Sequence, residues 1–189
     1  MYPRTCLLLG LLLGGVSCQS TQSRLALEAR YVTADSEESS YDEADSPVGG
    51  AFQMSSMPIQ GADHRLGWEL GLGQSSDSFA LPAGSYDLTH REAWLGLRYS
   101  FLDGHVRPYI SGGVQYTQHA VTLEFGGSTI ERKTDDIGPY GEAGLLLRLN
   151  PSLHTVLGYR RTFGMEGEMS PLELDLDTRQ VFLGVGLSF

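Results

Sequence analysis

Histidines are the residues of this chain best suited to chemistry, and there are five: His64, His90, His105, His119 and His154. An imidazole can bind a metal or transfer a proton near neutral pH. Only His90 and His119 lie well inside segments of regular alternation. Whether they could act together depends on the elements that position them.

Those elements are predicted to be β-strands, because apolar and polar residues alternate in short segments separated by turn residues. No stretch after Cys18 shows a convincing helical period. The pattern predicts strands over 23–33, 47–57, 65–77, 87–101, 108–122, 138–149, 153–165 and 178–189.

The connections alternate in length. Short links are predicted at 58–64, 102–107 and 150–152, and longer, mostly more acidic loops at 34–46, 78–86, 123–137 and 166–177. Short turns on one side and long loops on the other are typical of outer-membrane barrels, in which the long loops face outward.

The N-terminus predicts export. Arg4, an apolar run from Cys6 to Leu13 and then small residues follow the order of a secretory signal, so 1–17 is predicted to be a signal peptide. Gly15-Val16-Ser17-Cys18 resembles a bacterial lipobox, which makes Cys18 a candidate for lipidation; ordinary cleavage near Ser17 or Cys18 is the alternative. Both cysteines lie in this segment, so no disulfide is expected in the mature domain, 18–189.

Charge excludes one class of partner. The net charge is −10, and removal of Arg4 with the signal makes it −11, which argues against nucleic acid.

The two faces of the strands decide between a membrane barrel and a soluble one. In the last strand, 178–189, Val181, Leu183 and Val185 share one face, while Gly184 and Gly186 lie on the other. An eight-stranded barrel has a lumen just wide enough for side chains. A small polar face therefore fits the lumen and a bulky apolar face fits lipid, although a soluble lipocalin-like barrel that holds an apolar ligand remains the alternative.

Hairpin register tests this assignment. A turn at 150–152 places Glu142 opposite Arg160, and a turn at 102–107 places His90 opposite His119. Trp94 counts onto the lumen face, where either the lumen accepts it or a bulge turns it outward. We predict a lumen filled by ion pairs among Glu28, Glu69, Glu92 and Glu142 and Arg30, Arg98, Arg148 and Arg160.

With these features the mature chain resembles the small OmpA/OmpX-type outer-membrane barrels over essentially its whole length. The alternating C-terminal strand ending in Phe189 resembles the sorting signal read by the barrel-assembly machinery. The resemblance implies an all-β, eight-stranded, up-and-down transmembrane barrel in the bacterial outer membrane, with lipid and the assembly machinery as partners. It implies no single activity.

The leading functional hypothesis is a non-enzymatic structural or surface-interaction barrel without an open pore, cofactor or metal. The alternative is a lipid-modifying enzyme that uses His90 and His119 at the outer rim, although two histidines make a poor metal site and no serine is tied to them by sequence. The acidic residues of 34–46 and 166–177 could gather cations, but a solvated loop is the favoured interpretation.

Overall fold

The computed structural model describes residues 23–36, 47–58, 66–81, 84–101, 104–169, 172–175 and 177–189. The predicted signal peptide and Cys18 lie outside this part of the chain. None of the described residues forms a helix long and apolar enough to cross a bilayer.

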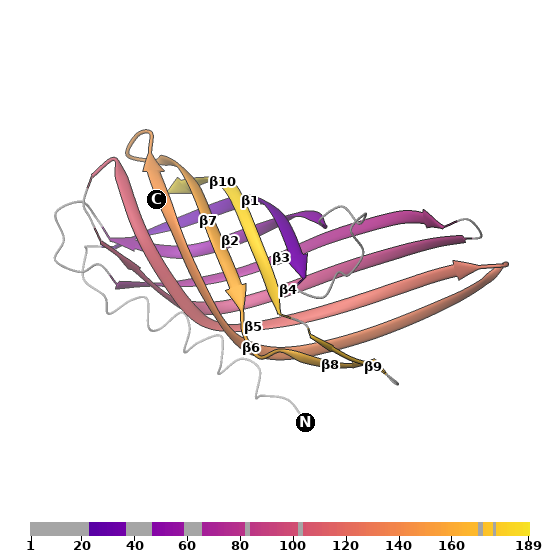
Figure 1. Cartoon of the computed structure of the whole chain (residues 1–189). Coiled ribbons are helices and arrows are strands. Elements are labelled where there is room, and N and C mark those ends of the chain that lie inside the picture. The colour runs from indigo at the N-terminus through magenta and orange to yellow at the C-terminus, as the bar shows by residue number, and fades with distance from the viewer. Residues whose placement is uncertain are drawn as a thin grey trace, which may run out of the picture.

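Eight antiparallel strands form a closed barrel in the order β1-β10-β7-β6-β5-β4-β3-β2, and β8 and β9 form a separate two-stranded sheet (Figure 1). This confirms the predicted fold class. The strands are β1 Ser23–Ser36, β2 Val48–Pro58, β3 Leu66–Leu81, β4 Gly84–Ser100, β5 Val106–Phe125, β6 Ser128–Arg148, β7 Leu153–Thr162, β8 Glu166–Met169, β9 Leu172–Asp175 and β10 Thr178–Ser188.

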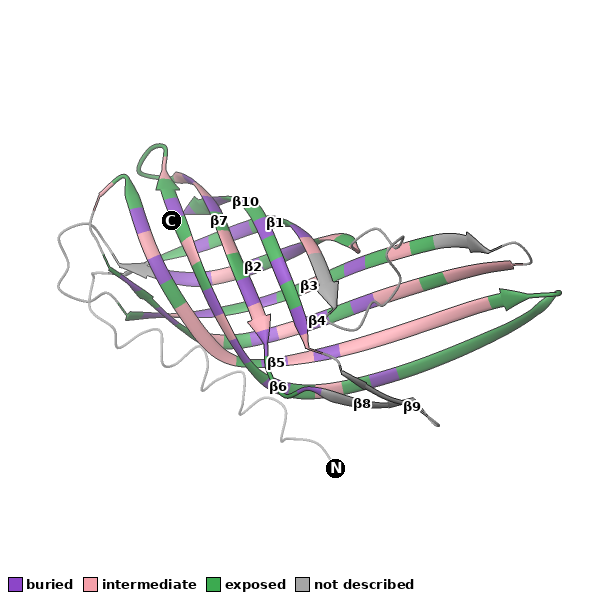
Figure 2. Cartoon of the chain, in the orientation of Figure 1, coloured by how far each residue is buried: buried purple, intermediate pink, exposed green. Residues whose placement is uncertain are grey.

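Buried and exposed residues alternate along the barrel strands (Figure 2). The exposed positions are apolar: Leu97 is 58% and Val185 55% exposed. Such a surface is stable only against lipid, which excludes the soluble, lipocalin-like alternative. We call this surface the apolar belt; it comprises Leu27, Tyr31, Phe52, Leu70, Leu72, Leu95, Leu97, Ile110, Val114, Ile137, Leu145, Leu157, Tyr159, Val181, Leu183, Val185 and Leu187.

Three of the predicted long loops are wrong. The segment 123–137 belongs to the β5–β6 hairpin, whose turn is only Gly126–Gly127, with φ of 59° and 83°. The segment 78–86 is mostly β3 and β4, and 166–177 contains β8 and β9. Most of the fourth long loop, 34–46, lies outside the described residues.

The extended strands β3, β4, β5 and β6 continue beyond the apolar belt as one sheet, seen in Figure 1 as the long arm of the molecule. The period of two persists in this arm, but the polarity of its faces is reversed. Thr122 and Glu124 of β5 now lie on the outward face, and Val121 and Leu123 lie on the face that continues the lumen. The reversal follows from the surroundings, because beyond the bilayer the outward face meets water.

Candidate functional site

The lumen contains a network of buried ion pairs with Glu142 of β6 at its centre. Arg160 Nη2 and Nε donate to this carboxylate at 2.6 and 2.9 Å, and Arg30 Nη1 donates at 3.1 Å. Tyr109 Oη donates at 2.8 Å, and Arg98 Nη2 lies 3.6 Å away. The sequence register had predicted the pairing of Glu142 with Arg160, and the structure confirms it.

The other three lumen carboxylates are held in the same way. Arg30 and Arg98 each pair with Glu28, at 2.8 and 3.1 Å. Arg98 Nε donates to Glu69 at 2.9 Å. Glu92 lies 3.8 Å from an Arg160 nitrogen and accepts hydrogen bonds from the side-chain amides of Gln115 and Gln180. All four carboxylates are buried, so these partners offset the cost of removing each charge from water.

Each arginine of the network also lies over an aromatic ring. The guanidinium carbon of Arg160 is 3.7 Å from the Trp94 ring centroid. Arg30 lies 4.1 Å from the ring of Phe182, and Arg98 lies 4.1 Å from that of Tyr109. Cation–π contacts between desolvated groups are stronger than exposed ones, so the rings stabilise the charges they cover.

Trp94 lies in the lumen without a bulge, only 2% exposed, and its indole N–H donates to Gln53 Oε1 at 3.2 Å. Gly71 lies directly across the β3–β4 ladder, where a Cβ atom would overlap the indole ring. Likewise, Gly186 lies directly across the β7–β10 ladder from His154, and a Cβ atom at Gly186 would overlap the imidazole ring. The small residues of the lumen face therefore make room for the large ones.

The structure adds histidines to the predicted set of lumen charges. The ion pairs described above join four glutamates to three arginines. Two histidines also lie near these carboxylates: His154 Nε2 is 3.5 Å from Glu28, and His90 Nε2 is 3.7 Å from Glu92. Arg148 lies opposite His154 in the β6–β7 ladder and is half-buried. The sequence pattern placed Arg148 on the correct face of β6, and its part in the lumen network stays a prediction.

The two histidines at the outer end of the lumen are brought together as predicted. His90 and His119 are cross-strand neighbours, with Nδ1 of His90 3.2 Å from Nε2 of His119. The register adds a residue that the sequence reasoning missed: Ser75 of β3 lies opposite His90. Ser75 and His90 are both buried, and the Ser75 hydroxyl has no hydrogen-bond partner among the residues that the structure describes. A serine activated as a nucleophile would instead be hydrogen-bonded to its base.

His119 lies beyond the apolar belt. Burial, and then the neighbouring His90, lower the pKa of His119 to about 3. The imidazole of His119 is therefore neutral near physiological pH. Among the residues that the structure describes, no group of three or more His, Cys, Asp or Glu side chains is arranged to hold a metal ion.

The remaining histidines are placed as follows. His105 is exposed near the turn between β4 and β5, and His154 is buried. His64 lies outside the described residues. The acidic positions within 37–46 also lie outside the described residues, as do the side chains of 166–169 and 172–175.

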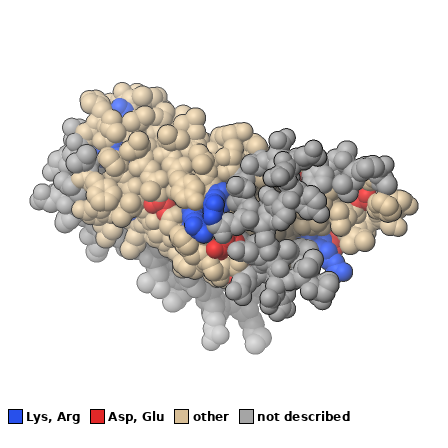
Figure 3. Space-filling view, in the orientation of Figure 1, with Lys and Arg blue, Asp and Glu red and all other residues tan. Residues whose placement is uncertain are grey.

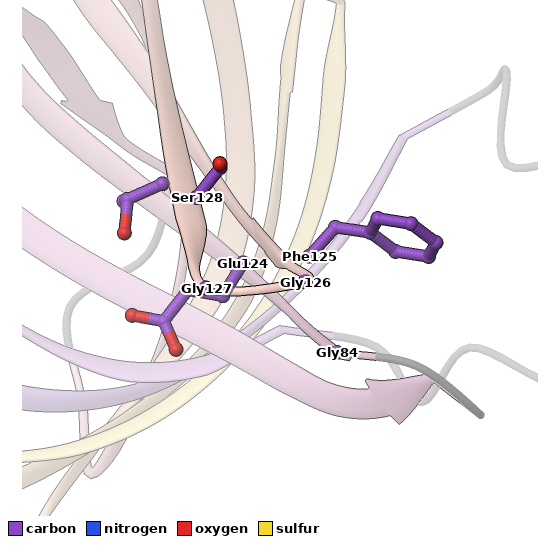
Figure 4. Close-up of a pocket in the computed structure, with 7 residues that line it drawn as sticks. Gly84, Glu124, Phe125, Gly126, Gly127 and Ser128 are labelled. Atoms are coloured by element: carbon purple, nitrogen blue, oxygen red, sulfur yellow. The ribbon is translucent and has the colours of Figure 1, made fainter.

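At the far end of the arm, the tips of two hairpins form a shallow pocket of about 340 Å³ (Figure 4). Gly84 lines it from β4, and the turn Gly126–Gly127 with its flanking residues lines it from the β5–β6 hairpin. Phe125 is 66% exposed here. The tip therefore presents an exposed aromatic ring well outside the membrane.

Solved structures similar to this chain are small outer-membrane barrels. Ail, the attachment invasion locus protein of Yersinia pestis, is 14% identical with a TM-score of 0.59; the match covers 89% of this chain and 98% of Ail. OprG from Pseudomonas aeruginosa is 18% identical with a TM-score of 0.60, covering 89% and 96%. Neisserial surface protein A is 16% identical with a TM-score of 0.53, covering 88% and 97%. No curated protein matches the chain in sequence.

A closed eight-stranded barrel with an apolar outer surface and a charged, filled lumen defines a transmembrane barrel of the bacterial outer membrane. Residues 5–189 match the outer membrane protein beta-barrel domain, and the chain belongs to that family.

Proposed function

We propose that this protein is a surface-contact protein, in which the barrel is a closed anchor and the arm formed by β3, β4, β5 and β6 is the contact surface. The observation that carries the proposal is the reversal of polarity in the arm. Apolar side chains such as Leu123 and Ile130 lie on its inner face, above a lumen that ion pairs fill. A structure that serves only to span the bilayer needs no such sheet beyond it.

The similarity to known barrels is consistent with this proposal. Ail, which has the same fold, is named for attachment and invasion, and it has been crystallised with the heparin analogue sucrose octasulfate. The present chain carries a net charge of −10, which disfavours a polyanion as its own partner. We therefore expect contact with a protein surface.

Shortening the arm tests this function. Deleting 121–124 together with 129–132 removes residues that pair with one another, and it preserves both the register and the Gly126–Gly127 turn. We expect cells that carry the shortened protein to lose adhesion to cultured host cells, while surface antibody staining of the protein is unchanged. Equal adhesion by the full-length and shortened proteins would contradict the proposal.

The enzymatic alternative rests on His90 and His119, and the structure adds Ser75 to their cross-strand row. We propose that the row is structural and closes the outer end of the lumen network, because Ser75 and His90 are buried. Mass spectrometry of extracted lipid A should show the same composition for wild type and for the double variant His90→Gln/His119→Gln. A changed composition would support the enzyme instead.

We propose that Phe189 acts as the sorting signal for barrel assembly. It is 67% exposed on the apolar side, and its backbone N–H donates to the Leu25 carbonyl at 2.8 Å beside the closing strand pair. Phe189→Ser should lower the amount of folded protein in outer-membrane fractions. We also propose that Cys18 is lipidated after signal cleavage; radioactive palmitate should label wild type but not Cys18→Ser.

A further inference from the structure

Two imidazole rings meet edge to edge at the outer end of the lumen. Nδ1 of His90 lies 3.2 Å from Nε2 of His119, and the ring planes are inclined at 73°. Histidine nitrogens bind zinc at about 2.0–2.1 Å, so an ion at that distance from both atoms would make a nitrogen–metal–nitrogen angle of about 100–105°. This angle lies between those of square-planar and tetrahedral coordination. The two nitrogens therefore have the spacing of two ligands to one metal ion.

A carboxylate lies beside the second nitrogen of His90. Glu92 Oε2 is 3.7 Å from Nε2 of His90, an ion-pair distance, and the side-chain amides of Gln115 and Gln180 hold Glu92 in place. The carboxylate favours the tautomer with its proton on Nε2, which leaves the Nδ1 lone pair directed at His119. Histidines that bind metals almost always direct their second nitrogen at a carboxylate, a carbonyl or a water. His90 therefore has the surroundings of a metal ligand.

This arrangement is specific to one pair. Among the residues that the structure describes, no other two histidines contact each other: His105 lies near a backbone carbonyl, and the nitrogens of His154 lie 3.5 Å from Glu28 and 3.3 Å from Ser188. His119 is half-buried beyond the apolar belt, so an ion outside the membrane can reach it. On the face seen in Figure 3, Asp and Glu atoms form only small groups on a mostly uncharged surface, so few carboxylates there would compete for a cation.

We propose that His90 and His119 bind a divalent transition-metal ion, Cu²⁺ more tightly than Zn²⁺, with Glu92 as a positioning residue. Without metal, one proton lies between the two nitrogens as a hydrogen bond; the ion replaces it, and His119 then carries its proton on Nδ1. No third His, Cys, Asp or Glu of the described residues is placed to bind the same ion, so water completes the coordination. Imidazole suits Cu²⁺ and Zn²⁺, whereas Mg²⁺ and Ca²⁺ prefer oxygen ligands. The site joins β4 to β5 at the base of the arm and does not rest on the proposed contact function.

The test uses the full chain folded in phosphatidylcholine vesicles and stripped of metal with a chelator. Its cysteines, Cys6 and Cys18, are alkylated so that thiols bind no metal. Cu²⁺ is added in substoichiometric amount, and electron paramagnetic resonance counts the nitrogen atoms bound to it. We expect hyperfine splitting from two imidazole nitrogens. Zn²⁺ should displace Cu²⁺ only in excess, and Mg²⁺ and Ca²⁺ should not displace it. Displacement by Mg²⁺, or a spectrum without two nitrogens, would overturn the proposal.

Variants locate the ion. His90→Gln and His119→Gln should each remove the two-nitrogen spectrum, while His105→Gln, which changes an exposed histidine outside the row, should retain it. Glu92→Gln should keep both nitrogens but bind Cu²⁺ roughly 10- to 100-fold more weakly, the usual cost of losing such a carboxylate.

The gel mobility of each variant reports whether its barrel is folded, and the half-buried His119 carries the test where substitution of a buried residue prevents folding. The two-nitrogen spectrum kept in His119→Gln, or lost equally in His105→Gln, would contradict the site. Wild-type affinity in Glu92→Gln would contradict the positioning role of the carboxylate.

Discussion

At the scale of single residues, Glu142 is the side chain on which the lumen network depends most. Its carboxylate receives hydrogen bonds from Arg30, Tyr109 and Arg160. Removing one member of a buried ion-pair network leaves the others desolvated and unpaired. A few buried charged groups therefore contribute to the stability of the barrel, in addition to the backbone hydrogen bonds between its strands.

Glu142→Gln should lower the free energy of unfolding by about 3–5 kcal/mol, since it leaves the two arginines without their shared charge. Urea unfolding in lipid vesicles would measure the change. Glu131→Gln is the control, because the Glu131 side chain is 56% exposed and, within the described part of the chain, forms an ion pair with Lys133 alone. The control should lose roughly 0.5 kcal/mol at most, as surface substitutions do. If Glu142→Gln lost no more unfolding free energy than the control, the network would contribute little to stability.

His119 gives a prediction with a defined pH range. Its folded-state pKa of about 3 lies below the ordinary value of 6.5, so folding favours the neutral form. The stability that His119 contributes is complete above pH 6.5 and is lost as the pH falls from 6.5 toward 3. The difference in unfolding free energy between wild type and His119→Gln should therefore shrink over this range. If the difference in unfolding free energy did not change with pH, the lowered pKa of His119 in the folded state would be contradicted.

At the scale of elements, the β5–β6 hairpin differs most from its prediction. Beyond the belt the strands carry polar residues outward and apolar residues inward, so the polarity that identifies a lipid-facing strand is reversed there. The Gly126–Gly127 turn requires positive φ at both residues, which matches the two-residue hairpins that join tightly twisted strands. The arm is thus a regular element whose sequence signal has the opposite polarity.

Gly126→Val/Gly127→Val should open the tip of the arm and leave the barrel intact. Each β-branched residue in this conformation costs roughly 1–2 kcal/mol. Protease treatment of intact cells should cut the variant within 121–132 faster than wild type, while the gel mobility of the folded barrel is retained. Cleavage at the same rate would indicate that the turn does not depend on its glycines.

At the scale of the whole molecule, closure of the barrel and filling of its lumen belong together. Eight strands leave a lumen that side chains can fill, and here Trp94, Phe182 and the ion pairs fill it. Because the lumen is filled, it is the outer surface of the barrel that contacts lipid and water.

Wild-type protein in planar bilayers should show no steady conductance steps. The shortened arm variant should behave in the same way, because side chains within the lumen, and not the arm, close the passage. Stable conductance by wild type would contradict the proposal that the barrel is closed. Conductance only after shortening would show that the arm, and not the side chains of the lumen, blocks the passage of ions.

The sequence by itself determined the class of fold, because the period of two in Leu183 and Val185 against Gly184 and Gly186 depends only on local geometry. Short turns also fixed hairpin register, and with it the pairs Glu142–Arg160 and His90–His119. These are relations between neighbouring strands, and neighbours along the chain are neighbours in the sheet.

Only the tertiary structure decided contacts across the lumen. Glu142 meets Arg30 of β1 and Arg98 of β4 because the sheet closes on itself, and closure fixes the depth at which each side chain stands. For the same reason His154 of β7 reaches Glu28 of β1. The arm was missed because the meaning of an apolar face changes where lipid gives way to water, and a one-dimensional pattern does not mark that boundary.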